Sequence, residues 1–115
     1  MQTIQAQELK RILSGENDTP VINVLGPEDY RDKHIPATVN IPVSSDDFTR
    51  KVEQHVHSKS KPVVVYCAKT ECDASEKAAK KLEAAGFTTV MDFSAGVAGW
   101  ESAGYELEGR QEPRA

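Results

Sequence analysis

Apolar residues follow two different spacings along the chain, which predict strands and helices in turn. Residues 21–25 and 62–66 are almost continuously apolar, as is typical of strands that are covered on both faces. Residues 38–41 and 88–93 predict two further strands. Because the segment 62–66 has the strongest strand pattern, with three consecutive valines, we expect it at the centre of the sheet.

Helices are predicted between these strands. Apolar residues at helical spacing run from residue 6 to residue 13, and a stripe of alanine and leucine marks residues 75–85 before a glycine. Shorter or weaker helical patterns cover three other segments, residues 27–30, 47–56 and 97–103. Strands that alternate with helices at these intervals indicate right-handed βαβ crossovers. We therefore expect one α/β domain with a parallel sheet and helices on both faces.

Composition narrows the range of functions. The 115 residues suit one domain, and two cysteines are far fewer than a short disulfide-stapled secreted protein carries. We therefore expect free thiols and a cytoplasmic location. The net charge of −4 argues against nucleic-acid binding, and no apolar run has the length that spans a bilayer, so we expect neither nucleic acid nor membrane as a partner.

Candidate chemistry gathers in the loop after the strongest strand. Ligands of parallel sheets bind beyond the carboxyl ends of the strands, and Cys67 occupies that position. We interpret Cys67 as the nucleophile, and we expect loop amides and the next helix N-terminus to lower the pKa of its thiol. Asp73 and Glu76 have the spacing of a capping box, which predicts a helix that begins just after Asp73. The predicted substrate-binding residues are those of the loop, Ala68, Lys69, Thr70, Glu71, Cys72 and Asp73.

Motifs on both sides of this loop resemble the rhodanese-like family in their order and spacing. They are Val21-Ile22-Asn23-Val24-Leu25, Pro27-Glu28-Asp29-Tyr30, His34-Ile35-Pro36, Val39-Asn40-Ile41-Pro42, and Gly96 with Trp100 before Ala103-Gly104-Tyr105. The resemblance implies one rhodanese-like domain over residues 1–108 with a five-stranded parallel sheet, followed by a polar tail at 109–115. It also implies a sulfurtransferase, in which Cys67 takes a sulfane sulfur from a donor as a persulfide and passes it on.

The expected reaction partners follow from this resemblance. We expect a small-molecule or protein-bound sulfane sulfur donor, a thiol or cyanide-like acceptor, and no cofactor. A metal site is not expected, because His55 and His57 have neither helical spacing nor nearby acids that could complete a ligand set with the two cysteines.

Some residues differ from the family pattern or bear on the choice of donor. Asn23 and Leu25 stand where the family commonly has Asp and Arg, so a charge pair near the active face is missing. Within the loop one cation, Lys69, faces two anions, Glu71 and Asp73. This balance repels a dianion, so we expect thiosulfate to be a poor donor.

The sequence is also compatible with other roles for the two cysteines and for the loop. Cys67 could be an inert buried cysteine, and Cys72 could be an inert loop residue, a second acceptor or a resolving thiol. The same loop could also serve a non-enzymatic persulfide carrier or a regulatory binding module. A phosphatase is disfavoured, because Asp73 stands where the phosphate-binding arginine would be. His34 and Trp100 are interpreted as structural residues.

Overall fold

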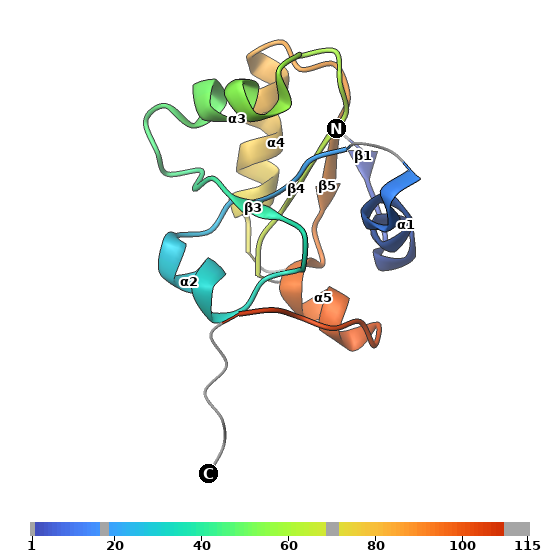
Figure 1. Ribbon diagram of the computed structural model, residues 1–115. Helices are drawn as coiled ribbons and strands as arrows, with labels where there is room; N and C mark the ends of the chain where they lie inside the picture. The colour runs from blue at the N-terminus through green and yellow to red at the C-terminus, as the bar shows by residue number, and fades with distance from the viewer. Residues whose placement is uncertain (1, 17–18, 69–71, 110–115) are drawn as a thin grey trace.

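A parallel sheet of five strands runs through the middle of the molecule (Figure 1). The structure is a computed structural model that describes residues 2–16, 19–68 and 72–109. The strands described are β1 (Gln2–Thr3), β2 (Val21–Asn23), β3 (Val39–Asn40), β4 (Val63–Tyr66) and β5 (Val90–Phe93). Their order is β1-β5-β4-β2-β3, and all pairings in this sheet are parallel. The central strand is β4, as its sequence predicts.

Helices cover both faces of the sheet, which confirms the predicted fold class. They are α1 (Ala6–Arg11) with the wide turn η1 (Ile12–Glu16), α2 (Pro27–Asp32), α3 (Phe48–Val56), α4 (Ala74–Ala84) and α5 (Gly96–Ser102). On one face α3 and α4 bury residues such as Val52 and Leu82 against the sheet. On the other face α1 and α5 bury Leu9 and Trp100. In Figure 1 the helices α3 and α4 lie on one side of the strands, and α1 and α5 lie on the other.

The edge strand β1 has no apolar pattern that predicts it. Gln2 and Thr3 are both exposed, so they show no periodicity of burial. They pair with Met91 and Asp92 of β5, and the N–H of Ile4 donates to the carbonyl of Asp92 over 3.1 Å. The strand therefore forms because β5 offers a free edge to the beginning of the chain, a contact between residues far apart in sequence.

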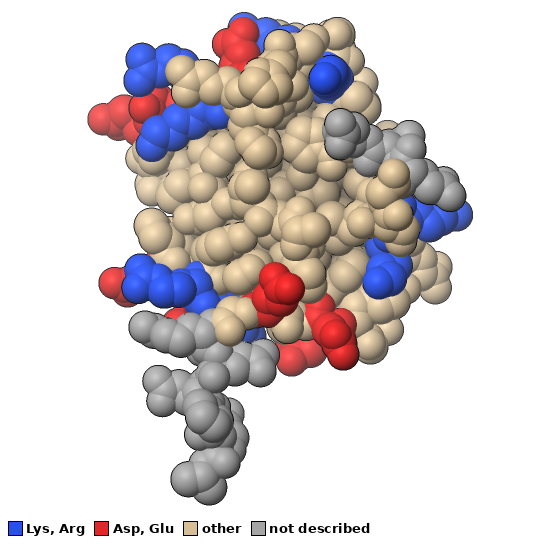
Figure 2. All heavy atoms as spheres, viewed as in Figure 1, with Lys and Arg blue, Asp and Glu red and all other residues tan. Residues whose placement is uncertain are grey.

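Charged side chains lie around the margin of the face shown in Figure 2, where Lys and Arg stand beside Asp and Glu around an uncharged centre. At the start of α3, Asp47 makes ion pairs with Arg50 (3.0 Å) and Lys51 (3.5 Å). Within the described segments, no helix is both long and apolar enough to pass through a bilayer.

Candidate active site

Cys67 lies at the carboxyl end of the central strand. Its side chain is fully buried (0% exposed) in the cluster between the sheet and helices α3 and α4. The carbonyl groups of Cys67 and Ala68 accept hydrogen bonds from the N–H groups of Val97 (3.0 Å) and Ala98 (2.8 Å). These N–H groups belong to the first turn of α5 and have no acceptor within their own helix. The backbone at Cys67 is therefore fixed to α5.

The thiol of Cys67 faces the beginning of α4. Its Sγ atom lies 3.4 Å from the carbonyl oxygen of Cys72 and 3.6 Å from Oγ of Ser75. Ser75 belongs to the first turn of α4 and is itself only 1% exposed. Both oxygens can accept the single thiol proton, so these contacts suit a neutral thiol.

Burial raises the pKa of the Cys67 thiol, so the prediction of a lowered pKa is wrong for this arrangement. The Cys72 side chain raises the pKa further, whereas the hydroxyl and backbone N–H of Ser75 lower it without offsetting burial. The physical reason is that a buried thiolate loses its hydration, and one serine does not replace it. The resting thiol is therefore protonated at neutral pH.

The structure brings the two cysteines together. Cys72 is half-buried and packs against the cluster that contains Cys67, and both are free thiols. Ala68 is half-buried beside them. The other predicted loop residues, Lys69, Thr70 and Glu71, lie outside the described residues. In the part of the chain that the structure describes, no group of three or more His, Cys, Asp or Glu side chains could hold a metal ion.

Helix α4 begins just after Asp73, as the sequence predicts, but the predicted capping box of Asp73 and Glu76 is wrong. Asp73 is the N-cap residue, and its side chain makes no capping hydrogen bond. It is exposed and pairs with Lys77 (3.4 Å), while Glu76 pairs with Lys80 (3.4 Å). Both carboxylates thus have a cation one turn along the helix, which competes with the backbone N–H groups for them.

Two buried polar residues, Ser75 beside the thiol and Asp92 in β5, are not among the predicted site residues. Asp92 lies in β5 with a side chain that is 4% exposed, and its Oδ1 atom has no hydrogen-bond partner among the described residues. Burial raises the pKa of Asp92, the hydroxyl group of Ser75 lowers it, and the charge of Glu76 raises it. The available signal was an aspartate inside the otherwise apolar pattern of the last strand.

Amide hydrogen bonds take the place of the charge pair that is missing after β2. Asn23 is fully buried, and its Oδ1 accepts the N–H of Leu25 (2.9 Å). Nδ2 of Asn40 donates to the carbonyl groups of Leu25 (2.8 Å) and Asn23 (3.2 Å). The two asparagines therefore hold the turn after β2 without any charge.

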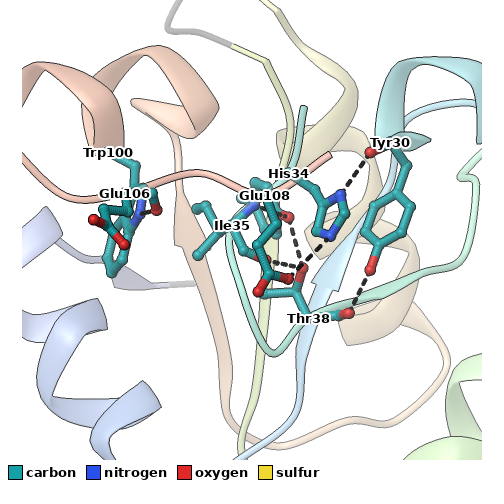
Figure 3. A network of polar contacts seen from close by, with 8 residues as sticks. Tyr30, His34, Ile35, Thr38, Trp100, Glu106 and Glu108 are labelled. Atoms are coloured by element: carbon teal, nitrogen blue, oxygen red, sulfur yellow. Dashed lines mark hydrogen bonds and ion pairs between the residues drawn. The ribbon is translucent and has the colours of Figure 1, made fainter. Parts of the chain in front are cut away.

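His34 has a structural role, as predicted (Figure 3). Its Nδ1 is 2.7 Å from the carbonyl oxygen of Tyr30, and the two rings stack with centroids 3.9 Å apart. Its backbone exchanges two hydrogen bonds of 2.8 Å with Glu108, whose carboxylate is 3.6 Å from Nε2. No local sequence pattern places an acid beside His34, because Glu108 comes from the far end of the chain.

A hollow of about 380 Å³ opens beside Ala68, at the start of the loop. Four apolar residues, three acids and one lysine line it: Leu25, Ala68, Val97, Ala98, Asp29, Asp32, Glu101 and Lys33. A ligand in this hollow meets more negative than positive side chains, which disfavours a dianion.

A sequence model of the rhodanese-like domain matches residues 5–103, which is most of the chain. The chain belongs to the rhodanese-like family. No match is found among curated protein sequences. Cys67, at the end of the central strand of this rhodanese-like domain, therefore lies well within the matched region.

Solved structures share the rhodanese-like fold. The rhodanese-like domain of an Anabaena sp. protein is 27% identical with a TM-score of 0.82, covering 100% of this chain and 86% of that one. A rhodanese-like domain protein from Staphylococcus aureus is 25% identical with a TM-score of 0.73, covering 96% and 100%. A thiosulfate sulfurtransferase from Pseudomonas aeruginosa is 21% identical with a TM-score of 0.80, covering 96% of this chain but 21% of its own, and shows the fold alone.

Proposed function

We propose that this rhodanese-like domain is a sulfurtransferase that carries a sulfane sulfur as a persulfide on Cys67. The observation that supports this most is a free thiol at the carboxyl end of the central strand, held between α4 and α5. The Cys67 thiolate attacks the sulfane sulfur of a donor, and the rest of the donor leaves with the electron pair of the broken bond. A thiol or cyanide-like acceptor then attacks the outer sulfur, and the Cys67 thiolate leaves.

A non-enzymatic persulfide carrier is the second candidate, and the buried thiol gives it some support. A protonated, fully buried thiol reacts slowly, which suits a carrier that is loaded by a partner protein. Thiocyanate formation from a sulfane sulfur donor and cyanide separates the two functions. We expect many thiocyanate molecules per protein molecule, whereas a single equivalent would show a carrier without turnover.

We expect thiosulfate to be a poor donor because of the charge around the loop. Asp73 pairs with Lys77 and Glu101 of the hollow pairs with Lys33 (4.0 Å), so these two carboxylates repel a dianion less than isolated acids, while the formal charge of the loop and of the hollow stays negative. The double variant Glu71→Gln with Asp73→Asn should raise the second-order rate constant for thiosulfate about tenfold, since one partly screened charge supplies about 1.4 kcal/mol. The rate should also become less sensitive to salt.

Two comparisons control for unspecific charge effects on this rate. Lys69→Gln should lower the rate constant for thiosulfate, because it removes the one cation of the loop. Glu8→Gln removes one negative charge from α1, on the other face of the sheet, and should leave the rate unchanged. Fast turnover of thiosulfate that none of the loop variants alters would show that these charges do not face the sulfur site.

Cys72 acts in this proposal as a resolving thiol. Peroxide oxidises the Cys67 thiol to a sulfenic acid and is itself reduced to water. The Cys72 thiolate then attacks the sulfur of Cys67, and hydroxide leaves as the disulfide forms. The interaction of the two thiols and the 3.4 Å contact of Sγ with the Cys72 carbonyl support their proximity. Disulfide mapping after mild peroxide treatment should find the Cys67–Cys72 pair, and overoxidised Cys67 beside free Cys72 would contradict it.

A further inference from the structure

Two buried polar side chains, those of Ser75 and Asp92, share with Cys67 the face of the sheet that α4 covers. Ser75 Oγ lies 3.6 Å from Sγ of Cys67, and the same hydroxyl group is close enough to the carboxyl group of Asp92 to lower its pKa. Cys67 is 0% exposed, Ser75 1% and Asp92 4%, so all three residues are shielded from bulk solvent. The three side chains thus form a short polar chain inside the protein.

The sheet register places Asp92 on the face that carries Cys67. In β5 Asp92 is paired with Val65 of β4, which lies two residues before Cys67 and belongs to the same core cluster as the thiol. Side chains two residues apart in a strand point to the same face. Helix α4 covers this face and supplies Ser75 between the carboxyl group and the sulfur.

We propose that Asp92 accepts the thiol proton of Cys67 through the hydroxyl group of Ser75. The S–H bond of Cys67 breaks and leaves its electron pair on sulfur, while the proton passes to Oγ of Ser75. The original hydroxyl proton of Ser75 passes to the carboxylate of Asp92. Ser75 is unchanged at the end, and one negative charge has moved from Asp92 to Cys67. The inference builds on Cys67 as the nucleophile of the proposed function.

The surroundings of Asp92 make its carboxylate a stronger base than that of an ordinary aspartate. Oδ1 has no hydrogen-bond partner among the described residues, so the ionised carboxylate has an unsatisfied buried oxygen. Burial and the charge of Glu76 raise the pKa of Asp92, and only Ser75 opposes them. The neighbours of Asp92 on the adjoining strands, Thr3 and Val65, are not titratable. Asp92 can therefore hold a proton at a pH where an ordinary aspartate would not.

The relay also accounts for how a thiol with a raised pKa could react near neutral pH. Ionising Cys67 while Asp92 stays charged would leave two negative charges on one buried group of side chains, which is unfavourable. Passing the proton inward keeps a single buried charge, located on sulfur when a donor is present and on Asp92 when it is not. The two groups then titrate as a pair that shares one proton.

The test is the rate of iodoacetamide alkylation at Cys67 as a function of pH. Trypsin cleaves after Lys69, so mass spectrometry assigns the label to Cys67 or to Cys72 separately. The wild-type protein should show two rises separated by a plateau, the first below the ordinary thiol pKa and the second above it. Asp92→Asn should lose the first rise and react at least about tenfold more slowly at the plateau.

Further variants separate the relay from simpler effects. Ser75→Ala should lose the plateau while Asp92 is still present, and it carries the test if Asp92→Asn does not fold by circular dichroism. Glu76→Gln, a matched removal of one carboxylate, should keep both rises and move the first to lower pH, because Glu76 raises the pKa of Asp92.

Two results would overturn the relay. One is a single rise for the wild-type protein at or above the ordinary thiol pKa. The other is an Asp92→Asn protein that reacts as fast as or faster than the wild type at neutral pH, since Asp92 would then act only as a nearby negative charge. No sulfur donor is used, so failure of the relay is distinguishable from failure of sulfur transfer itself.

Discussion

Replacing Cys67 with serine abolishes sulfur transfer in the proposed mechanism, the largest effect we expect of any single change. A serine oxygen is a far weaker nucleophile at neutral pH and does not form a persulfide. We expect a loss of at least about a thousandfold in thiocyanate formation from a sulfane sulfur donor. The fold should persist, because the side chains differ by one atom at a site where the backbone is fixed to α5.

The matched control is Cys72→Ser, which removes the neighbouring thiol instead. Cys72 lies in the same loop but follows no strand and is only half-buried. We expect this variant to keep sulfur transfer and to lose the disulfide with Cys67. Sulfur transfer that survives Cys67→Ser and disappears in Cys72→Ser would make Cys72 the carrier.

Trp100→Ala should destabilise the fold by about 3–5 kcal/mol, the range found when a large buried aromatic side chain is removed. Trp100 is 2% exposed and packs edge-on against Phe93 at 6.5 Å between ring centroids. Its Nε1 donates to the carbonyl of Glu106 over 2.8 Å (Figure 3), which ties the C-terminal segment to α5. Its removal leaves a cavity beneath the helix that anchors the backbone of Cys67.

Trp100→Phe separates packing from the indole hydrogen bond. It keeps an aromatic ring and should cost about 1–2 kcal/mol, mainly the lost hydrogen bond and some packing. Unfolding in urea is followed by far-ultraviolet circular dichroism, because Trp100 is the only tryptophan and its fluorescence is lost in both variants. An alanine variant within about 1 kcal/mol of the wild type would contradict this role for Trp100.

Those strands that carry a strong local pattern were predictable from sequence. The three valines of β4 and the apolar run of β2 indicate buried parallel strands, and the structure places them side by side. By contrast, β1 consists of two exposed residues, and its pairing with β5 depends on a contact across most of the chain. Such pairings are fixed by tertiary structure and leave no local pattern.

Only the part of the candidate site that is formed by residues close together in sequence could be predicted. Cys67 follows the strongest strand and precedes a helix, and that order alone marks it as a candidate. Its contact with Ser75 and the position of Asp92 depend on how α4 lies over two strands. The direction of the thiol pKa was mispredicted for the same reason, because the depth of burial depends on packing that no loop motif encodes.

The most direct test of the proposed function is the intact mass of the wild-type protein after incubation with a sulfane sulfur donor. An organic polysulfide that ends in S–H, such as R–S–S–H, carries at most one negative charge on its sulfur chain, so the acids around the loop repel it less than the thiosulfate dianion. We predict a mass increase of one sulfur atom that cyanide removes, located by tryptic digestion on the peptide with Cys67. An unchanged mass with polysulfide and thiosulfate alike, or a cyanide-labile sulfur that persists in Cys67→Ser, would contradict persulfide transfer by Cys67.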